Sequence, residues 1–444
     1  MKKLALALFA LGATVTSQAA DLKNVFEQAL ANDPQLAAEV ALADANAQSE
    51  GLARQAILPT VTLNADIGSS NVEVGDNPEQ EFDTTTYSLQ ATQTLIAPES
   101  WYSYGAASAA TASAEIERRK AEQSLVVRIS EAYFNVLRAN AGLASAKAQE
   151  AAVKRQLEQT QQRFKVGLIA ITEVHEAQAI YDGATVELIA AESQLDIAYE
   201  SLALLTGERY DRINPLKEEI PLTGPVPADR TLWEQKALGQ NLDVLIAEKS
   251  QLSAERNHKS KISGHLPTVN LVGRYTSTDQ LSTANPDQDD ITSTYVGIQA
   301  DITSTYVGIN ISMPIFAGGA TWAGQKQAYY QRQAAEKSLE AAQRGATLNI
   351  RSLYRQLEAD VARIKARKQA TRSAQSAMEA TQTGYEVGTR NIVEVLQAQL
   401  SVFSAQRDYA FARYDYVIDL LKFRQAAGEL SVADIDEINA WLQR

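Results

Sequence analysis

Histidines and carboxylates are the residues of this chain that could carry out acid–base or metal chemistry, and their spacing argues against both. The histidines are His175, His258 and His265, and no two lie four residues apart, the spacing with which one helix holds a metal. Glu173 and Glu176 flank His175, but without a cleft such a group indicates a helix surface. The chain has no cysteine, glycine-rich phosphate loop or nucleophile motif. The sequence therefore predicts no enzyme activity, no catalytic or metal-binding residue and no cofactor.

The N-terminus and the charge indicate an exported protein that does not bind nucleic acid. Residues 1–19 combine a basic start, an apolar run and a small-residue cleavage site, which is typical of a secretory signal. A membrane anchor is the alternative, but the run is too short to span a bilayer. The mature chain is expected to start near Ala20, and loss of Lys2 and Lys3 takes the net charge from −13 to −15. Nucleic-acid binding needs clustered positive charge instead.

The sequence is built from two repeats. The matching pieces include Leu58–Val61 with Leu266–Val269, Trp101 with Trp322, and Val166-Gly167 with Val387-Gly388. Between residues 101 and 178 every partner lies 221 positions further on, without insertion or deletion. A repeat of this length predicts two equivalent architectural halves, residues 20–230 and 231–444.

Long helices dominate each predicted half. Pro98 and Pro215 enclose 116 residues without proline, and no proline follows Pro314. Both windows are rich in Ala, Gln, Glu, Lys and Leu, which favour helix. The expected long helices are residues 99–166 and 320–387, each roughly 100 Å long, and the expected return helices are residues 171–205 and 391–427. Each pair forms a hairpin that turns at Val-Gly, and the segments 206–230 and 428–444 complete an equatorial region.

Four segments alternate apolar and polar residues, which indicates strands with one apolar face and one polar face. They are residues 59–68, 84–97, 267–276 and 303–316, with polar, acidic loops between the paired strands at 69–83 and 276–290. Four strands are too few for a soluble sandwich. In a bilayer only a closed barrel satisfies the backbone, and four strands cannot close. The sequence predicts a barrel shared between identical chains, and the aromatics Trp101, Tyr102, Tyr104 and Trp322 are either interfacial or packed between helices.

One short duplication interrupts the second half. Residues 290–298 recur eleven positions later as residues 301–309. Because eleven is odd, an uninterrupted strand would place the copies on opposite faces. We assign the second copy, continuing through Ile311, Met313 and Ile315, to the barrel. The first copy is expected to be a loop, a bulge or an extended strand end, and a sequence duplication without function explains it equally well.

The order and spacing of these pieces resemble the TolC-like outer-membrane channel components of efflux pumps and type I secretion systems. The resemblance covers essentially the whole mature chain. It rests on the two Leu-Pro-Thr strand starts, Met313–Gly319, Arg163–Gly167 with Ile171–Val174, and Gly384–Arg390. It implies that three chains share a twelve-stranded β-barrel in the outer membrane. It also implies that their helices form a coiled-coil tunnel, an α-barrel, in the periplasm.

The resemblance implies a gate at the helical tips. Tyr385 and Arg390 match a tyrosine and an arginine that link inner and outer helix pairs in the family. Their expected partners are Thr172 and Glu173, with Gln156 as a further candidate. The first repeat carries Phe164 and Ile169 in place of Tyr385 and Arg390, so the two hairpins are not equivalent.

The resemblance also implies an acidic ring just past the second turn. Glu394 matches the first acidic position, and Gln397 stands where the best-known members carry a second aspartate, so the field should be weaker and cation block is in doubt. Three Glu394 carboxylates around an axis would favour cations. The alternative is that Glu394 is an ordinary helix-surface acid. Adaptor docking is expected at the tips, around Val166, Gly167, Val387 and Gly388.

The sequence therefore predicts a passive, gated, trimeric duct in the outer membrane of a Gram-negative bacterium, extending into the periplasm. Its expected partners are a periplasmic adaptor, an inner-membrane transporter of RND, ABC or MFS type, and outer-membrane lipid. Efflux and protein secretion both fit the resemblance. The competing hypothesis is a trimeric coiled-coil spacer or adhesin, which explains the helices and the signal but not four symmetrically placed strands.

Overall fold

The computed structural model describes residues 20–72, 80–283 and 299–443. The expected secretory signal and the first copy of the duplication, residues 290–298, lie outside the described residues. The described chain divides into two compact units. The helical unit takes in the described residues up to Ala41, Arg118–Val244 and those from Gln343 onward, and the sheet unit takes in those of Leu42–Glu117 and Leu245–Ala342.

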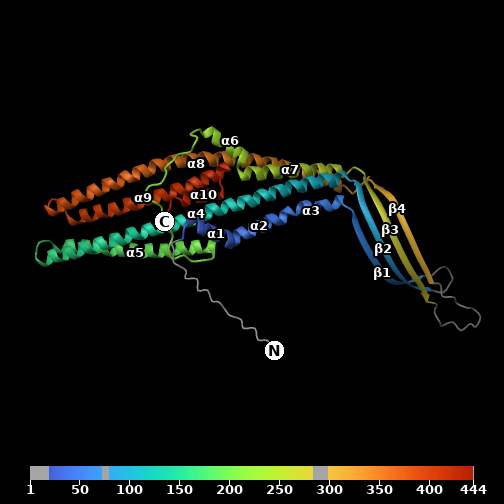
Figure 1. Cartoon of the computed structure of the whole chain (residues 1–444), viewed down its shortest axis with the longest axis horizontal. Coiled ribbons are helices and arrows are strands. Elements are labelled where there is room, and N and C mark those ends of the chain that lie inside the picture. Colours follow the sequence, from blue (N-terminus) through green and yellow to red (C-terminus); the bar gives the residue numbers. More distant parts are fainter. Residues whose placement is uncertain (1–19, 73–79, 284–298, 444) are drawn as a thin grey trace, which may run out of the picture. The chain divides into compact units, whose positions relative to one another are not determined.

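Helices and strands are separated between the units (Figure 1). The sheet unit contains α3 (Ser49–Arg54), the short 3-10 helix η1 (Gln55–Ile57), β1 (Thr60–Val72), β2 (Gln80–Ile96), β3 (Thr268–Thr283) and β4 (Gln299–Ser312). The helical unit contains α1 (Leu22–Asn32), α5 (Ile171–Thr206), α6 (Arg230–Gln240), α9 (Ile392–Ala427) and α10 (Val432–Asn439). Four helices have residues in both units: α2 (Pro34–Ala47), α4 (Pro98–Lys165), α7 (Leu242–Ser263) and α8 (Ala320–Glu386). None of the helices in the described ranges has an apolar stretch that could span a bilayer.

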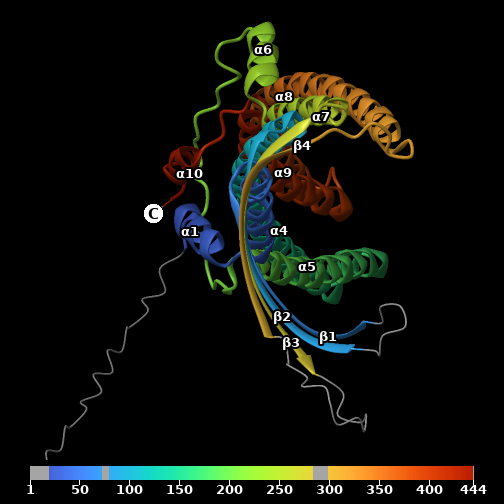
Figure 2. The ribbon, with the colours of Figure 1, turned by 90° about the vertical axis from the view of Figure 1, so that its right-hand side faces the viewer.

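The four strands form one curved antiparallel sheet in the order β1-β2-β3-β4 (Figure 2). Directly paired residues point to the same face of a sheet, so the register shows which side chains share a face. One face carries the rows Val61, Ala91, Gly273, Val307 and Leu63, Leu89, Tyr275, Thr305. The other carries Thr62, Gln90, Arg274, Tyr306 and Asn64, Ser88, Thr276, Ser304. The sheet therefore has one largely apolar face and one largely polar face.

The apolar face is open in the chain by itself. The Leu63 side chain is 72% exposed and that of Ile67 is 80% exposed. The apolar band ends at the row of Ile67, Thr85, Asp279 and Asp301, where two carboxylates join the same face. Across the polar face, Arg274 Nη2 donates to Gln90 Oε1 at 2.7 Å. Neither edge strand, β1 or β4, has a partner on its outer side among the described residues.

The strands differ from the expected ranges at their ends. β1 continues to Val72, β2 begins at Gln80 and β3 continues to Thr283, so much of the two expected loops is strand. Polar composition suggested loops, but threonine favours strand and the backbone ladder tolerates polar side chains. The expected strand 303–316 is wrong at its C-terminal end, because β4 ends at Ser312. Pro314 lacks the N–H that a ladder needs, and Gly318 and Gly319 follow with φ of 58° and 84°.

Two helical hairpins and a central core make up the helical unit. Figure 1 shows α5 beside the C-terminal part of α4, and α9 beside α8. The core gathers fully buried side chains from α1, α4, α8 and α9, among them Leu22, Tyr133, Leu357, Tyr416 and Leu421. The segment 206–230 ties both ends of the described chain to this core, because Ala20 pairs with Ile213 and Leu216 with Leu442.

Leu421 offers a test of this core because its side chain is fully buried. Replacing Leu421 with alanine leaves a cavity, so we expect a loss of about 2–5 kcal/mol of unfolding free energy. Leu421→Met conserves volume and should cost less than about 1.5 kcal/mol. The measurement is the thermal unfolding midpoint of the folded protein, followed by circular dichroism. Equal midpoints for the two variants would contradict the packing described.

Candidate functional site

The two hairpin tips end in the same backbone motif. Gly167 has φ of 75° and Gly388 has φ of 81°, in the left-handed region that glycine adopts without strain. At the first tip the Gly167 and Leu168 amides donate to the carbonyls of Phe164 and Arg163. At the second tip the Gly388 and Thr389 amides donate to the carbonyls of Tyr385 and Gly384. This pair of bonds is the Schellman motif, which closes a helix where its last carbonyls lack partners.

A small apolar cluster joins the two hairpins close to their tips. Its buried members come from all four long helices: Val153, Leu157, Ala177, Tyr385, Ile392, Val395 and Leu396. Five of these residues, Val153, Ala177, Ile392, Val395 and Leu396, have no exposed surface. The cluster is separate from the main core, so the tips have their own packing interaction and can change without the core.

Tyr385 is held in this cluster by its ring. Its side chain is 8% exposed, and the Arg163 guanidinium lies 4.9 Å from the ring centroid, in cation–π contact. Its hydroxyl is buried and has no hydrogen-bond partner among the described residues. A buried hydroxyl without a partner costs free energy, so this group is available for a bond that the isolated chain does not make.

Arg390 makes a different contact from the one expected of a latch. From the turn just before α9, its Nη1 donates to Glu394 Oε2 in the first turn of that helix at 2.5 Å. The Asn391 side chain caps α9 by accepting from the Glu394 amide at 2.9 Å. Arg390 and Glu394, expected to act in the latch and in the acidic ring, are therefore paired with each other. The spacing of four residues could have revealed this pair from the sequence.

The remaining predicted residues lie around the same tips. Gln156 is 7% exposed, lies between Val153 and Leu157 in α4, and has a buried Nε2 without a partner in the described chain. Thr172 is exposed and Glu173 is half-buried, both in the first turn of α5, while Gln397 is exposed on α9. The structure thus gathers the predicted residues near the four-helix tip, and the latch bonds themselves stay a prediction.

The valines of the tips point to solvent. Val166 is 70% and Val387 is 71% exposed, beside the two turn glycines. Leu168, 68% exposed, extends this apolar surface on the first tip. Single exposed apolar residues are ordinary, but three such large exposures at matching turns give each tip a small apolar surface.

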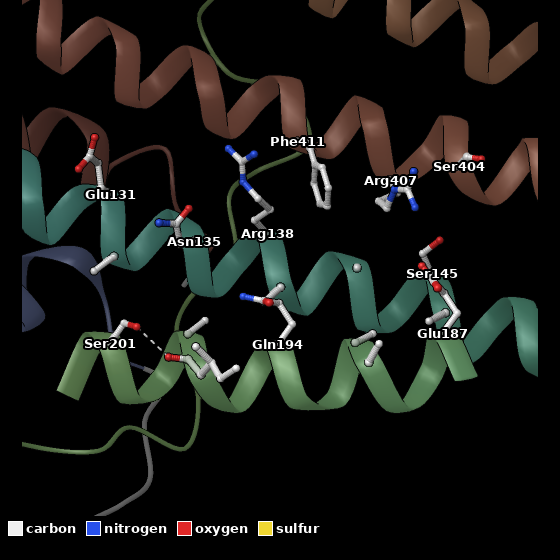
Figure 3. A pocket seen from close by; sticks show the side chains of 18 of the residues that line it. Glu131, Asn135, Arg138, Ser145, Glu187, Gln194, Ser201, Ser404, Arg407 and Phe411 are labelled. Carbon is white, nitrogen blue, oxygen red and sulfur yellow. Dashed lines mark hydrogen bonds between the residues drawn. The ribbon is translucent and has the colours of Figure 1, made fainter. Parts of the chain in front are cut away.

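A cavity of about 1110 Å³ lies away from the tips, between α4, α5 and α9 (Figure 3). Small residues such as Gly142 and Gly183 form part of its wall. Arg138 and Arg407 lie 5.3 and 5.9 Å from the Phe411 ring centroid. Both arginines are already paired with aspartates, Arg138 with Asp415 and Arg407 with Asp408. The cavity therefore offers no free cation from this pair to bind an anionic ligand.

The sequence profile of the family described as outer membrane efflux protein matches residues 25–208 and 233–429. The chain belongs to the outer membrane efflux protein family. Within the described residues, no cluster of His, Cys, Asp or Glu side chains suits a metal ion.

Relatives in this family carry informative names. Outer membrane protein TolC of Vibrio cholerae serotype O1 is 36% identical, over 100% of this chain and 99% of that protein. The alkaline protease secretion protein AprF of Pseudomonas aeruginosa is 27% identical, over 94% of this chain and 86% of that protein. The crystal structure of the Campylobacter jejuni CmeC outer membrane channel has a TM-score of 0.76 at 16% identity, covering 95% of this chain and 90% of that chain. The last likeness shows that the family fold is shared.

Tyr385 tests the geometry of the tip. Tyr385→Phe keeps the ring contacts and removes only the hydroxyl, which has no partner among the described residues, so amide hydrogen exchange near residues 150–160 and 385–400 should accelerate much less than in Tyr385→Ala. Tyr385→Ala leaves a cavity costing about 3–5 kcal/mol and should accelerate exchange there strongly. Equal acceleration in both variants would mean that the hydroxyl has a partner within the chain.

Proposed function

We propose that this protein is the outer-membrane channel-tunnel of a tripartite efflux pump or a type I secretion system. The observation that carries the proposal is the sheet, which has an exposed apolar face, a polar face and two unpaired edges among the described residues. Family membership and the names of the relatives TolC and AprF support it. The protein conducts its substrates passively, and catalysis is no part of this role.

The sheet is completed by other copies of the chain. In hydrocarbon every backbone polar group needs a partner, so strands must close into a barrel without edges. A barrel needs about eight strands or more, and one chain supplies four. The resemblance to TolC-like channels implies three chains, which give twelve strands, with β4 of one copy beside β1 of the next. The apolar rows face lipid and the polar rows, with Arg274 and Gln90, line the lumen. A coiled-coil spacer would not need a sheet with one apolar face and one polar face.

The helical hairpins of the three copies form the periplasmic tunnel. Partners dock at the tips, where Val166 and Val387 stand exposed beside Gly167 and Gly388. The partners are a periplasmic adaptor and an inner-membrane transporter of RND, ABC or MFS type. The transporter supplies the energy and the substrate selectivity, because a passive duct contributes neither.

The gate is a latch at these tips that involves Tyr385 and Arg390 on one hairpin. The Tyr385 hydroxyl and the Gln156 amide, both buried without partners in the described chain, support this assignment because each gains from a bond. Arg390 must leave Glu394 to reach Thr172 or Glu173. A largely exposed ion pair is typically worth only about 0–1 kcal/mol, so the exchange costs little. Opening is then a two-state change of the tips, biased by partner contacts.

Arg390 also controls the charge of the entrance. Glu394 is the acid of the ring, and Gln397 adds no charge beside it. While Arg390 pairs with Glu394, the two charges largely cancel. Breaking the latch therefore widens the entrance. It also changes the ion preference of the entrance, because Arg390 takes part in the latch and pairs with Glu394.

Single-channel conductance of the detergent-extracted, folded protein in a planar bilayer tests the function. Wild type should give a small, cation-preferring conductance, and Tyr385→Phe with Arg390→Ser should raise it several-fold. Arg390→Lys keeps the charge beside Glu394 and is the matched control for ion preference. Glu394→Gln in the double variant should reduce its cation preference.

Each other outcome has a distinct meaning. A protein that is released without detergent and gives no conductance would overturn the channel and favour the spacer. A steady conductance that the tip variants leave unchanged would keep the channel and remove the gate from Tyr385 and Arg390.

A further inference from the structure

A buried carboxyl group lies between α8 and α9, away from the tips. The side chain of Asp360 on α8 is 1% exposed. Along α8 it is separated from Tyr385 by roughly 40 Å of helix. Its neighbours on α8 are the buried Leu357 and Ile364 of the main core. An isolated ionised carboxylate is energetically unfavourable in a buried, apolar environment. The neighbouring groups therefore determine whether Asp360 is protonated.

One oxygen of Asp360 is well supplied with donors and the other is not. Gln356 Nε2 donates to Oδ1 at 3.2 Å, and Arg363 Nη2 lies 3.1 Å from the same oxygen. Oδ2 is buried, and no donor among the described residues reaches it. The group within hydrogen-bonding reach of this carboxyl across the helix interface is another acid, Asp419 on α9.

The surrounding charges come from three helices. α8 contributes Arg363, which is 41% exposed. α9 contributes Asp419 and, one turn away, Asp415. α4 contributes Arg138, which is paired with Asp415. Three carboxylates and two guanidinium groups therefore lie close together. One of the guanidinium groups, that of Arg138, is already paired with Asp415. Two ionised carboxylates in contact repel each other strongly, and one proton between them converts the repulsion into a hydrogen bond.

We propose that Asp360 keeps a proton and forms a proton-dependent link between α8 and α9. In the protonated state the Asp360 O–H donates to the Asp419 carboxylate. This bond holds the second hairpin together in the helical unit. When the proton leaves, the contact between the two side chains becomes repulsive. The link goes beyond the channel function, because neither conduction nor the tip latch requires it.

The pH range of the link follows from the environment of Asp360. Burial, the hydrogen bond with Asp419 and the charges of Asp419 and Asp415 raise the pKa of Asp360 from its ordinary 3.8 to about 7, although Arg363 opposes the rise. Between these values the unfolded chain has lost the proton and the folded chain keeps it. Stability therefore falls as pH rises through this window and levels off above pH 7. The link is complete in mild acid and is lost at mildly alkaline pH.

Infrared spectroscopy of the folded, detergent-extracted protein tests whether Asp360 keeps its proton. Most Asp and Glu side chains are ionised at about pH 6, so a protonated carboxyl gives a separate C=O band there. Wild type should show such a band at about pH 6 and lose it by about pH 8.5. Asp360→Asn and Asp419→Asn should each remove it. Asp408→Asn is the matched control, because Asp408 also joins α9 to α8, through Arg367 at 3.1 Å.

Thermal unfolding supplies a second readout. The unfolding midpoint of wild type and of Asp408→Asn should fall between about pH 5 and about pH 7.5, and that of Asp360→Asn should fall less. Absence of the carboxyl band in wild type at about pH 6 would overturn the proposal, even if the variants fail to fold. So would a band that persists in both folded variants. These outcomes do not depend on conductance, so they are independent of the channel proposal.

Discussion

The requirement that every backbone amide and carbonyl in a membrane find a partner is the constraint on which this structure depends. The chain makes four antiparallel strands and leaves β1 and β4 unpaired on their outer sides within the described residues. It also sorts its side chains so that Leu63, Leu89 and Tyr275 share one face, and Arg274 and Gln90 share the other. Under the proposed function such a sheet is a fragment of a barrel, and assembly with other copies is a condition of its folding in the membrane.

The tips differ from the sheet, because apolar packing holds them together and strong polar bonds do not. The cluster around Ile392, Val395 and Leu396 packs the four helices, and the turn glycines close each hairpin without strain. The polar groups assigned to the proposed latch either have no partner among the described residues, like the Tyr385 hydroxyl, or are weakly engaged, like Arg390. The proposed gate would therefore rely on apolar packing to preserve the tips while the polar bonds are exchanged.

Long, regular elements could be predicted from the sequence, and tertiary detail could not. The four long helices begin and end within one residue of the expected ranges, because proline and the Val-Gly turns mark their ends. The strand ends were predicted less well, because threonine-rich strand resembles a polar loop. α1 was missed although Asp21 caps it and Leu22, Val25, Phe26 and Ala29 are spaced as one helix face. No sequence pattern predicted a role for Asp360, because its burial against Asp419 depends on how α8 packs on α9.

The most direct test of the account is whether β1 of one copy lies beside β4 of another. The chain has no cysteine, so single cysteines can be placed along β1, from Thr62 to Gly68, and along β4, from Thr303 to Asn310, without background. After oxidation of folded protein in membranes, denaturing electrophoresis should show cross-linked dimers and trimers for pairs in register. Cross-links should disappear when the β4 cysteine is moved to a central strand such as β3. Monomers at every pair of positions would contradict the shared barrel and the channel that depends on it.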